Sequence, residues 1–263
     1  MNKVILLIPY YNNPEGLYKS LNSISDLESI DVLVVDDGSD FGFDTNLVET
    51  NFKANGSLFV EKLEVNSGIE HALNKGLEFI LERSYTYVAR LDCGDVCLPN
   101  RFGIQETFLK AHPAVALVGT NVEFVDHNGQ ILYSLKMPSK DHRIRKRMYL
   151  NAMHIHPTIM FRSEILNTIG LYPTNYKAAE DYAFFFKILA HYKLANINQV
   201  LVQCESNSKG ISTIQRKMQA KNRIRIIWEN FYFGLYPIYG LLRAFLLYLI
   251  PLRLLNFLKR TFK

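Results

Sequence analysis

The segment Tyr85–Arg101, YTYVARLDCGDVCLPNR, places two carboxylates, Asp92 and Asp95, directly after a short apolar run, Tyr87–Leu91. Two carboxylates at the end of a buried strand repel one another at neutral pH. Mg²⁺ or Mn²⁺ would remove that repulsion, because these ions take oxygen ligands and are held by one or two carboxylates together with substrate phosphates. Asp and Gly are also ordinary turn residues, so this segment alone is equally compatible with a polar turn.

Three further polar clusters follow apolar runs of the kind that forms strands buried on both faces. The pairs are Val4–Ile8 with Tyr10–Asn13, Ile30–Val35 with Asp36–Ser39, and Phe59–Leu63 with Asn66–Gly68. A helical pattern over Ile69–Leu81 alternates with these runs, which predicts a doubly wound α/β fold with a mostly parallel sheet. Ligands bind beyond the carboxyl ends of such strands, so we expect all four clusters to share one edge and one site.

The second half of the chain predicts an antiparallel extension of that sheet. The apolar runs Ala116–Val125 and Ile131–Leu135 are separated by a turn containing Asn-Gly, a strong hairpin signal. Farther on, Glu180 and Asp181 open a helix with an apolar body. Acidic residues stabilise a helix N-terminus through its dipole, so their position has a purely structural interpretation as well.

The C-terminal segment is both basic and apolar. Ile211–Asn230 has the pattern of an amphipathic basic helix, and Leu241–Leu258 is mostly apolar but contains Arg243, Pro251 and Arg253. A spanning helix needs about 20 predominantly apolar residues, and these interruptions argue against one. We expect helices that lie in a membrane interface, with Arg and Lys reaching for anionic headgroups. The alternative is a helical hairpin packed on the core or in a dimer interface.

Composition narrows the class of protein. The chain has 263 residues, of which 48% are apolar and 21% charged, values typical of a globular protein. A net charge of +5 without a recognised binding module gives no reason to expect nucleic acid. The three cysteines form neither a disulfide framework nor a zinc spacing. The first apolar run is too short for a signal peptide, so we expect a cytoplasmic protein, peripheral on the inner face of the cytoplasmic membrane.

Six segments in order carry a resemblance to a known family: IPYYNN, VVDDGS, NSGIEHALNKGL, YVARLDCGD, HPTIMFR and AEDYAFF. The chain resembles a family 2 glycosyltransferase of the Rossmann-like GT-A fold, the bacterial kind that builds lipopolysaccharide and capsule polysaccharides. The resemblance runs from Val4 to about Cys204. It implies a catalytic domain over residues 1–209, with a nucleotide-sugar half (1–98) and an acceptor half (99–209). Residues 210–263 would then form a helical, membrane-associated region.

The resemblance also implies roles for individual residues. Pro9, Tyr10 and Tyr11 would line the pocket of the base, Asp36 or Asp37 would bind the base and ribose, and Asn66 and Gly68 would lie near the nucleotide. Arg90 would approach the diphosphate, and Asp92 and Asp95 would bound the motif for Mn²⁺ or Mg²⁺. Asp181, together with Glu180, would be the general base, and His156 would lie on the acceptor side.

The chain departs from the family pattern at Gly94, where most relatives carry an Asp. Either Asp95 replaces that ligand, or one carboxylate and the diphosphate suffice. The motif Gln-x-x-Arg-Trp of processive members has no match at Gln215–Gln219. The expected activity is therefore inverting, non-processive transfer of one sugar, with UDP as the expected nucleotide, to a hydroxyl of a glycan or lipid-linked acceptor.

Two other functions remain open at this point. A non-catalytic nucleotide-sugar-binding or scaffold protein would explain Gly94. A sugar nucleotidyltransferase would usually carry a Gly-rich loop with Arg or Lys after the first strand, and Tyr10–Asn13 lacks one.

Overall fold

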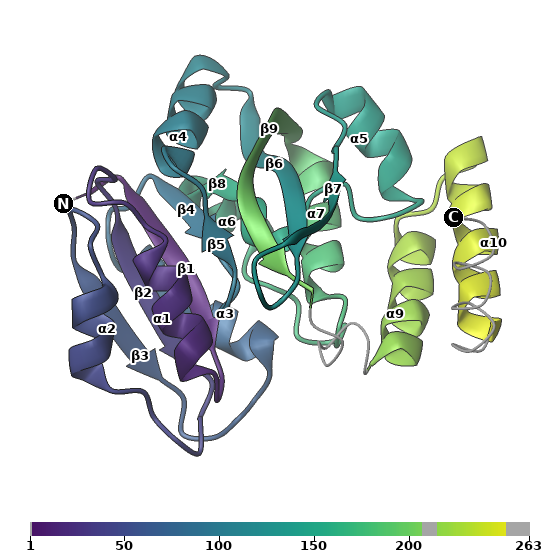
Figure 1. The fold of residues 1–263 in the computed structure, drawn as a ribbon. Helices are drawn as coiled ribbons and strands as arrows, with labels where there is room; N and C mark the ends of the chain where they lie inside the picture. The colour runs from purple at the N-terminus through teal and green to yellow at the C-terminus, as the bar shows by residue number, and fades with distance from the viewer. Residues whose placement is uncertain (1, 207–214, 251–263) are drawn as a thin grey trace.

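The computed structural model describes residues 2–206 and 215–250 (Figure 1). Within these residues, nine strands form one sheet in the order β3-β2-β1-β4-β8-β6-β9-β5, with β7 paired to β6. The strands are β1 (Val4–Tyr10), β2 (Asp31–Asp36), β3 (Leu58–Lys62), β4 (Tyr87–Arg90), β5 (Val96–Cys97), β6 (Val115–Val125), β7 (Ile131–Leu135), β8 (Met160–Arg162) and β9 (Lys193–Glu205). The helices are α1 (Pro14–Asn22), α2 (Thr45–Asn51), α3 (Ile69–Leu81), α4 (Arg101–Ala111), α5 (Asp141–Met148), α6 (Leu166–Ile169), α7 (Glu180–His191), α9 (Arg216–Glu229) and α10 (Leu235–Leu249).

The first half of the sheet is parallel, as the continuous apolar runs predict. β1 pairs in parallel with β2 on one side and β4 on the other, and β3 joins β2. Every residue of β1 and β2 is buried. Alternate side chains enter two cores: Ile5 and Leu7 pack with α3 and α7, while Leu6 and Ile8 pack with α1 and α4. Burial on both faces explains why these strands show no polar alternation.

The second half contains the predicted antiparallel extension. β8 runs antiparallel to β4 and to β6, and β6 forms the expected hairpin with β7. A long parallel pairing of β6 with β9 and the short strand β5 against β9 were not predicted. These pairings join residues far apart in the sequence, so no local sequence pattern predicts them. The α/β fold class, with its mostly parallel sheet and antiparallel extension, is confirmed.

The helix α3 has the predicted bounds, whereas α2 was missed because its sequence is largely polar. The side chain of Asp44 caps α2 by accepting a hydrogen bond from the backbone N–H of Asn46 at 2.8 Å. Such a cap can stabilise a helix that has no apolar stripe. A prediction from apolar periodicity does not detect a helix of this kind.

The C-terminal helices α9 and α10 lie side by side at the edge of the molecule (Figure 1). Arg216 joins them, because its guanidinium donates to the carbonyls of Leu247 at 2.7 Å and Ile250 at 3.0 Å. None of the helices within residues 2–206 and 215–250 has the length and hydropathy to cross a membrane. Parts of the two predicted C-terminal helices, residues 211–214 and 251–258, lie outside the described residues.

Candidate active site

The loops after β1, β2 and β3 meet at one edge of the sheet and are joined by hydrogen bonds. The backbone N–H of Asp37 donates to the carbonyl of Tyr10 at 2.9 Å, and that of Asn12 donates to Oγ of Ser39 at 2.9 Å. The carboxylate of Asp37 accepts from the N–H groups of Ser67 at 2.9 Å and Gly68 at 3.0 Å. The structure thus brings together these three polar clusters, and the fourth joins them because Sγ of Cys93 donates to the carbonyl of Asn13 at 3.4 Å.

Asp36 and Asp37 are both buried in this edge. Asp36 accepts from the N–H of Ser39 at 2.9 Å and lies 3.6 Å from Nζ of Lys62. Burial raises the pKa of Asp37, while the N–H groups of Ser67 and Gly68 oppose that rise. Both aspartates therefore hold the loops in place, and a base or ribose could use only lone pairs that the backbone leaves free.

The three residues expected to line the base pocket differ in exposure. Tyr10 is 1% exposed, and its ring packs edge-on against Phe43 with centroids 5.0 Å apart. Tyr11 is 44% exposed at the same edge. Pro9 lies within the buried strand β1. Tyr11 is the residue of the three whose ring is free to stack on a base, while Tyr10 belongs to the core.

Arg90 holds Asp92 rather than facing an open site. Its guanidinium is fully buried and donates to the carbonyls of Leu7 at 2.6 Å and Leu91 at 3.0 Å. Another N–H donates to Oδ1 of Asp92 at 2.7 Å, and the side chain of Asp92 is 40% exposed. The expected approach of Arg90 to a diphosphate does not fit this burial. Arg90 instead orients the exposed carboxylate of Asp92.

Asp95 points away from the edge. It is 7% exposed, and its Oδ1 accepts from the backbone N–H of Glu205 at 3.0 Å. Its own carbonyl accepts from Oγ of Ser20 at 2.8 Å. Burial, followed by the charge of Asp92, raises the pKa of Asp95 to about 7. The expectation that Asp95 binds the metal does not fit this position, because the carboxyl is turned inward and fastens β9 to the loop.

Gly94 cannot supply a side-chain ligand, and its backbone has a φ of +104°, a conformation that favours glycine. Within the described residues, no group of three or more His, Cys, Asp or Glu side chains could hold a metal ion. Of the two carboxylates in this motif, Asp92 is therefore the one whose exposed side chain could hold a metal ion. One carboxylate fits a Mg²⁺ or Mn²⁺ ion whose other ligands come from a diphosphate and water.

Glu180 and Asp181 occupy the first turn of α7 and have different surroundings. Oε2 of Glu180 is buried and has no hydrogen-bond partner among the described residues. Burial, followed by the charge of Asp181, raises the pKa of Glu180 to about 8. Burial also raises the pKa of Asp181, but the N–H of Tyr182, at 2.6 Å from Oδ1, and the charge of Arg223 oppose the rise. The positive charge of Arg223 favours the ionised form of Asp181, whereas the charges that act on Glu180 are negative, so Asp181 is the better candidate for the proton acceptor.

His156 is buried against Tyr172 and Arg90. Its Nε2 lies 2.9 Å from the hydroxyl of Tyr172 and 3.5 Å from Nε of Arg90. Burial and the charge of Arg90 hold the pKa of His156 well below its usual range, so the ring is neutral. His156 links Arg90 to the loop before α7, and an open acceptor-side position for it does not fit this burial.

Two residues near the carboxyls were not singled out from the sequence. Glu70, in the first turn of α3, is 3% exposed, and its charge contributes to the raised pKa of Glu180. Arg223 of α9 lies over the ring of Tyr182, with its Cζ 4.7 Å from the centroid, and hydrogen-bonds Asn151. Glu70 could have been found from the sequence, because it lies two residues after Gly68 in the expected nucleotide site. Nothing in the local sequence indicated that Arg223 would contact α7.

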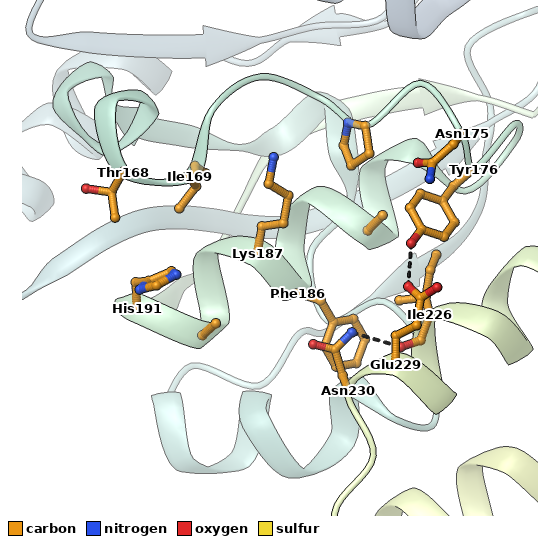
Figure 2. A pocket seen from close by; sticks show the side chains of 13 residues that line it. Thr168, Ile169, Asn175, Tyr176, Phe186, Lys187, His191, Ile226, Glu229 and Asn230 are labelled. Atoms are coloured by element: carbon orange, nitrogen blue, oxygen red, sulfur yellow. Dashed lines mark hydrogen bonds between the residues drawn. The ribbon is translucent and has the colours of Figure 1, made fainter.

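A separate hollow of about 520 Å³ lies between α6, α7 and α9 (Figure 2). Its walls include Lys187 and His191 of α7, and the hydroxyl of Tyr176 points to the carboxylate of Glu229 across it. None of the residues expected to bind a nucleotide sugar lines it. The chemistry therefore belongs to the edge of the sheet, not to this hollow.

Comparison with known sequences places these features in a family. A family model described as "Glycosyl transferase family 2" matches residues 5–170. The amylovoran biosynthesis glycosyltransferase AmsE of Erwinia amylovora is 29% identical over 96% of both chains. The O-antigen biosynthesis glycosyltransferase WbnJ of Escherichia coli is 30% identical over 40% of both chains.

Solved structures share the fold at lower identity. S. aureus TarS 1–349 in complex with UDP-GlcNAc aligns with a TM-score of 0.66 and 22% identity, covering 90% of this chain and 69% of TarS 1–349. This chain spans 41% of a longer TarS chain. The mannosyltransferase PcManGT from Pyrobaculum calidifontis, in complex with GDP-Man and Mn²⁺, aligns with a TM-score of 0.63 and 17% identity, covering 92% of this chain and 68% of PcManGT.

The architecture is therefore the GT-A fold of these neighbours, with an acidic edge made of Asp92, Glu180 and Asp181. The family match covers more than half of the chain and includes all four strand-end clusters in full. The chain is a glycosyltransferase and belongs to glycosyl transferase family 2.

Proposed function

We propose that the enzyme is an inverting, non-processive transferase that moves one sugar from a nucleotide diphosphate sugar to a hydroxyl. The observation that carries this proposal is the unequal pair at the start of α7. Glu180 is deeply buried, and its Oε2 has no partner in the part of the chain that the structure describes, whereas Asp181 has an N–H and the charge of Arg223 to favour its ionised form. Such a pair supplies one proton acceptor and one hydrogen-bond donor at neutral pH.

The donor half is formed by residues 1–98 and the acceptor half by residues 99–209. The ring of Tyr11 stacks on the base, and the loops held by Asp36 and Asp37 surround the ribose. The backbone at Gly68, with a φ of +105°, allows close approach of the nucleotide. UDP is the proposed nucleotide; the neighbours bind UDP-GlcNAc in one case and GDP-Man in another, so the nucleotide must be tested.

Asp92, held by Arg90, would bind the Mn²⁺ or Mg²⁺ ion that accompanies the diphosphate. When bound, such an ion neutralises charge on the leaving diphosphate. The carboxylate of Asp181 takes the proton of the acceptor hydroxyl as that oxygen attacks the anomeric carbon. The protonated carboxyl of Glu180 donates a hydrogen bond to a sugar hydroxyl beside it. Attack from the side opposite to the leaving group inverts the anomeric configuration, and no second nucleophile is needed.

The proposed acceptor is a growing glycan or lipid-linked sugar, and the proposed place of work is the inner face of the cytoplasmic membrane. Support comes from two relatives, whose names assign them to amylovoran and O-antigen biosynthesis. A lipopolysaccharide or capsule is the corresponding class of product. Residues 210–263 would hold the catalytic domain at that membrane.

Donor hydrolysis tests the proposal. UDP-, GDP- and dTDP-sugars are incubated with Mn²⁺ or Mg²⁺, and released nucleotide is measured. Metal-dependent release from one donor is expected, and Asp181→Asn should reduce it at least about a hundredfold while leaving nucleotide binding intact. Glu78→Gln, an exposed change on α3, is the control variant. Nucleotide binding with no turnover, even after acceptors from a membrane extract are added, would favour the non-catalytic binding protein instead.

A further inference from the structure

Helix α10 is apolar on both faces. Its inner face packs on the core through Leu241 and Ala244, and Gly240 contacts the backbone of Tyr149. On its outer face, apolar residues recur at helical spacing, and each side chain is between 45% and 80% exposed. These residues are Leu235, Ile238, Tyr239, Leu242, Phe245, Leu246 and Leu249. Arg243, the sole charged residue of α10, turns inward to the carbonyl of Leu150. An ordinary surface helix would carry charges on its outer face.

Exposed aromatic residues also occur next to α10 in the sequence. Phe233, in the loop between α9 and α10, is 95% exposed, and Trp228, near the end of α9, is 67% exposed. Trp and Tyr side chains combine an apolar ring with a polar edge and therefore favour the boundary between lipid and water. Lys217 and Lys221 are exposed on α9, and neither has an ion pair within the part of the chain that the structure describes.

The charge of the chain is divided unequally. Residues 207–263 contain 11 Lys and Arg against one acidic residue, Glu229, whereas residues 1–206 contain 19 against 24 Asp and Glu. An anionic surface would therefore attract the C-terminal segment and repel the catalytic part. A second copy using the same face would bring two basic surfaces together, which charge repulsion opposes.

We infer that the outer faces of α9 and α10, with the loop between them, bind the surface of a bilayer that contains anionic phospholipid. Helix α10 has 15 residues, too few to span a hydrocarbon core, so it lies in the plane of the interface with its outer face among the acyl chains. The lysines of α9 contact the headgroups. This inference rests on the membrane location proposed above and names the surface that would make the contact.

Vesicle sedimentation of the full chain tests the inference. The vesicles consist of phosphatidylcholine alone or of an equimolar mixture with phosphatidylglycerol. The wild type should pellet with the mixed vesicles, and less at high salt. Leu235→Ser combined with Leu242→Ser should reduce partitioning at least about tenfold, because both leucines leave the acyl region. Lys217→Gln with Lys221→Gln should reduce it about tenfold on mixed vesicles only.

Matched controls come from exposed residues on other parts of the molecule. Leu27→Ser with Leu81→Ser removes two exposed leucines, and Lys3→Gln with Lys53→Gln removes two exposed lysines. Neither control should change sedimentation. Circular dichroism and melting temperature confirm that every variant folds.

Three results would overturn the inference. The first is a wild type that stays in solution with mixed vesicles, and the second is a leucine variant that pellets like the wild type. The third is a dimer, measured by light scattering, that the leucine variant abolishes without any vesicle binding. No donor is needed, so a failure here leaves sugar transfer untouched. Conversely, an inactive protein that binds vesicles would refute only the proposed sugar transfer.

Discussion

Replacing Glu180 with Gln removes a carboxyl that the fold keeps protonated, and the effect can be measured without any substrate. Burial, together with the charge of Asp181, raises the pKa of Glu180 from its ordinary value of 4.5 to about 8. Between these values the folded chain binds one proton more than the unfolded chain at this residue. Its contribution to stability is therefore greatest at low pH and is lost as pH rises toward the folded pKa.

The size of the effect follows from this one proton. One bound proton changes the free energy of unfolding by about 1.4 kcal/mol for each pH unit. From pH 5.5 to pH 7.5 the wild type should lose up to about 3 kcal/mol that Glu180→Gln keeps. Asp95 remains in both proteins and contributes to both slopes. Glu180 and Asp181 titrate as an interacting pair, so the difference between the slopes reports the titration of this pair of carboxyls.

Urea denaturation at several pH values, followed by circular dichroism, measures both slopes. Glu78→Gln, which changes an exposed carboxylate, should reproduce the wild-type slope. At pH 7.5 the Glu180→Gln protein should be more stable than the wild type. Equal slopes for wild type and Glu180→Gln would refute the reasoning, because Glu180 would then be ionised in the folded chain and available as a base.

Three further outcomes are expected. Arg90→Met should lower the free energy of unfolding by about 3 kcal/mol in urea, because the buried carbonyls of Leu7 and Leu91 lose their donor. With UDP present, Mn²⁺ should raise the melting temperature of the wild type. Asp92→Asn should abolish that rise. Asp95→Asn should keep it when the melting temperature is compared with that of the same variant without metal. Loss of the rise in Asp95→Asn alone would contradict the assignment. Gly240→Ala should destabilise the chain by about 1–3 kcal/mol in the same urea assay, because the added Cβ would lie 2.3 Å from the carbonyl oxygen of Tyr149, and an unchanged midpoint would refute that contact.

Much of the fold follows from patterns that are local in the sequence. The runs of β1 and β2 are apolar at nearly every position because both faces of these strands are buried. The apolar spacing of α3 gave its bounds, and the Asn-Gly turn predicted the hairpin of β6 with β7. A polar cluster after each parallel strand was enough to predict a shared edge, because the carboxyl ends of parallel strands point the same way.

The direction of each side chain at that edge depends on contacts that the sequence does not reveal. Asp92 and Asp95 are three residues apart, yet one faces solvent beside Arg90 and the other is turned inward toward Glu205, 110 residues away. Both look equally suited to a metal in the sequence. Their exposure differs because the Ser20 hydroxyl and the end of β9 fix the backbone of the loop.

Glu180 and Asp181 are a further case, because adjacent carboxyls have the same sequence context. Burial raises the pKa of both carboxyls, the charge of Glu70 of α3 adds to the rise at Glu180, and the charge of Arg223 of α9 opposes the rise at Asp181. Packing alone brings Glu70 and Arg223 close to α7. Local sequence therefore determined the strands, the edge and the residue types of the site. The tertiary structure alone decided which carboxyls are buried, which keep a proton and which remain open to a ligand, since solvation and charge depend on neighbours from distant parts of the chain.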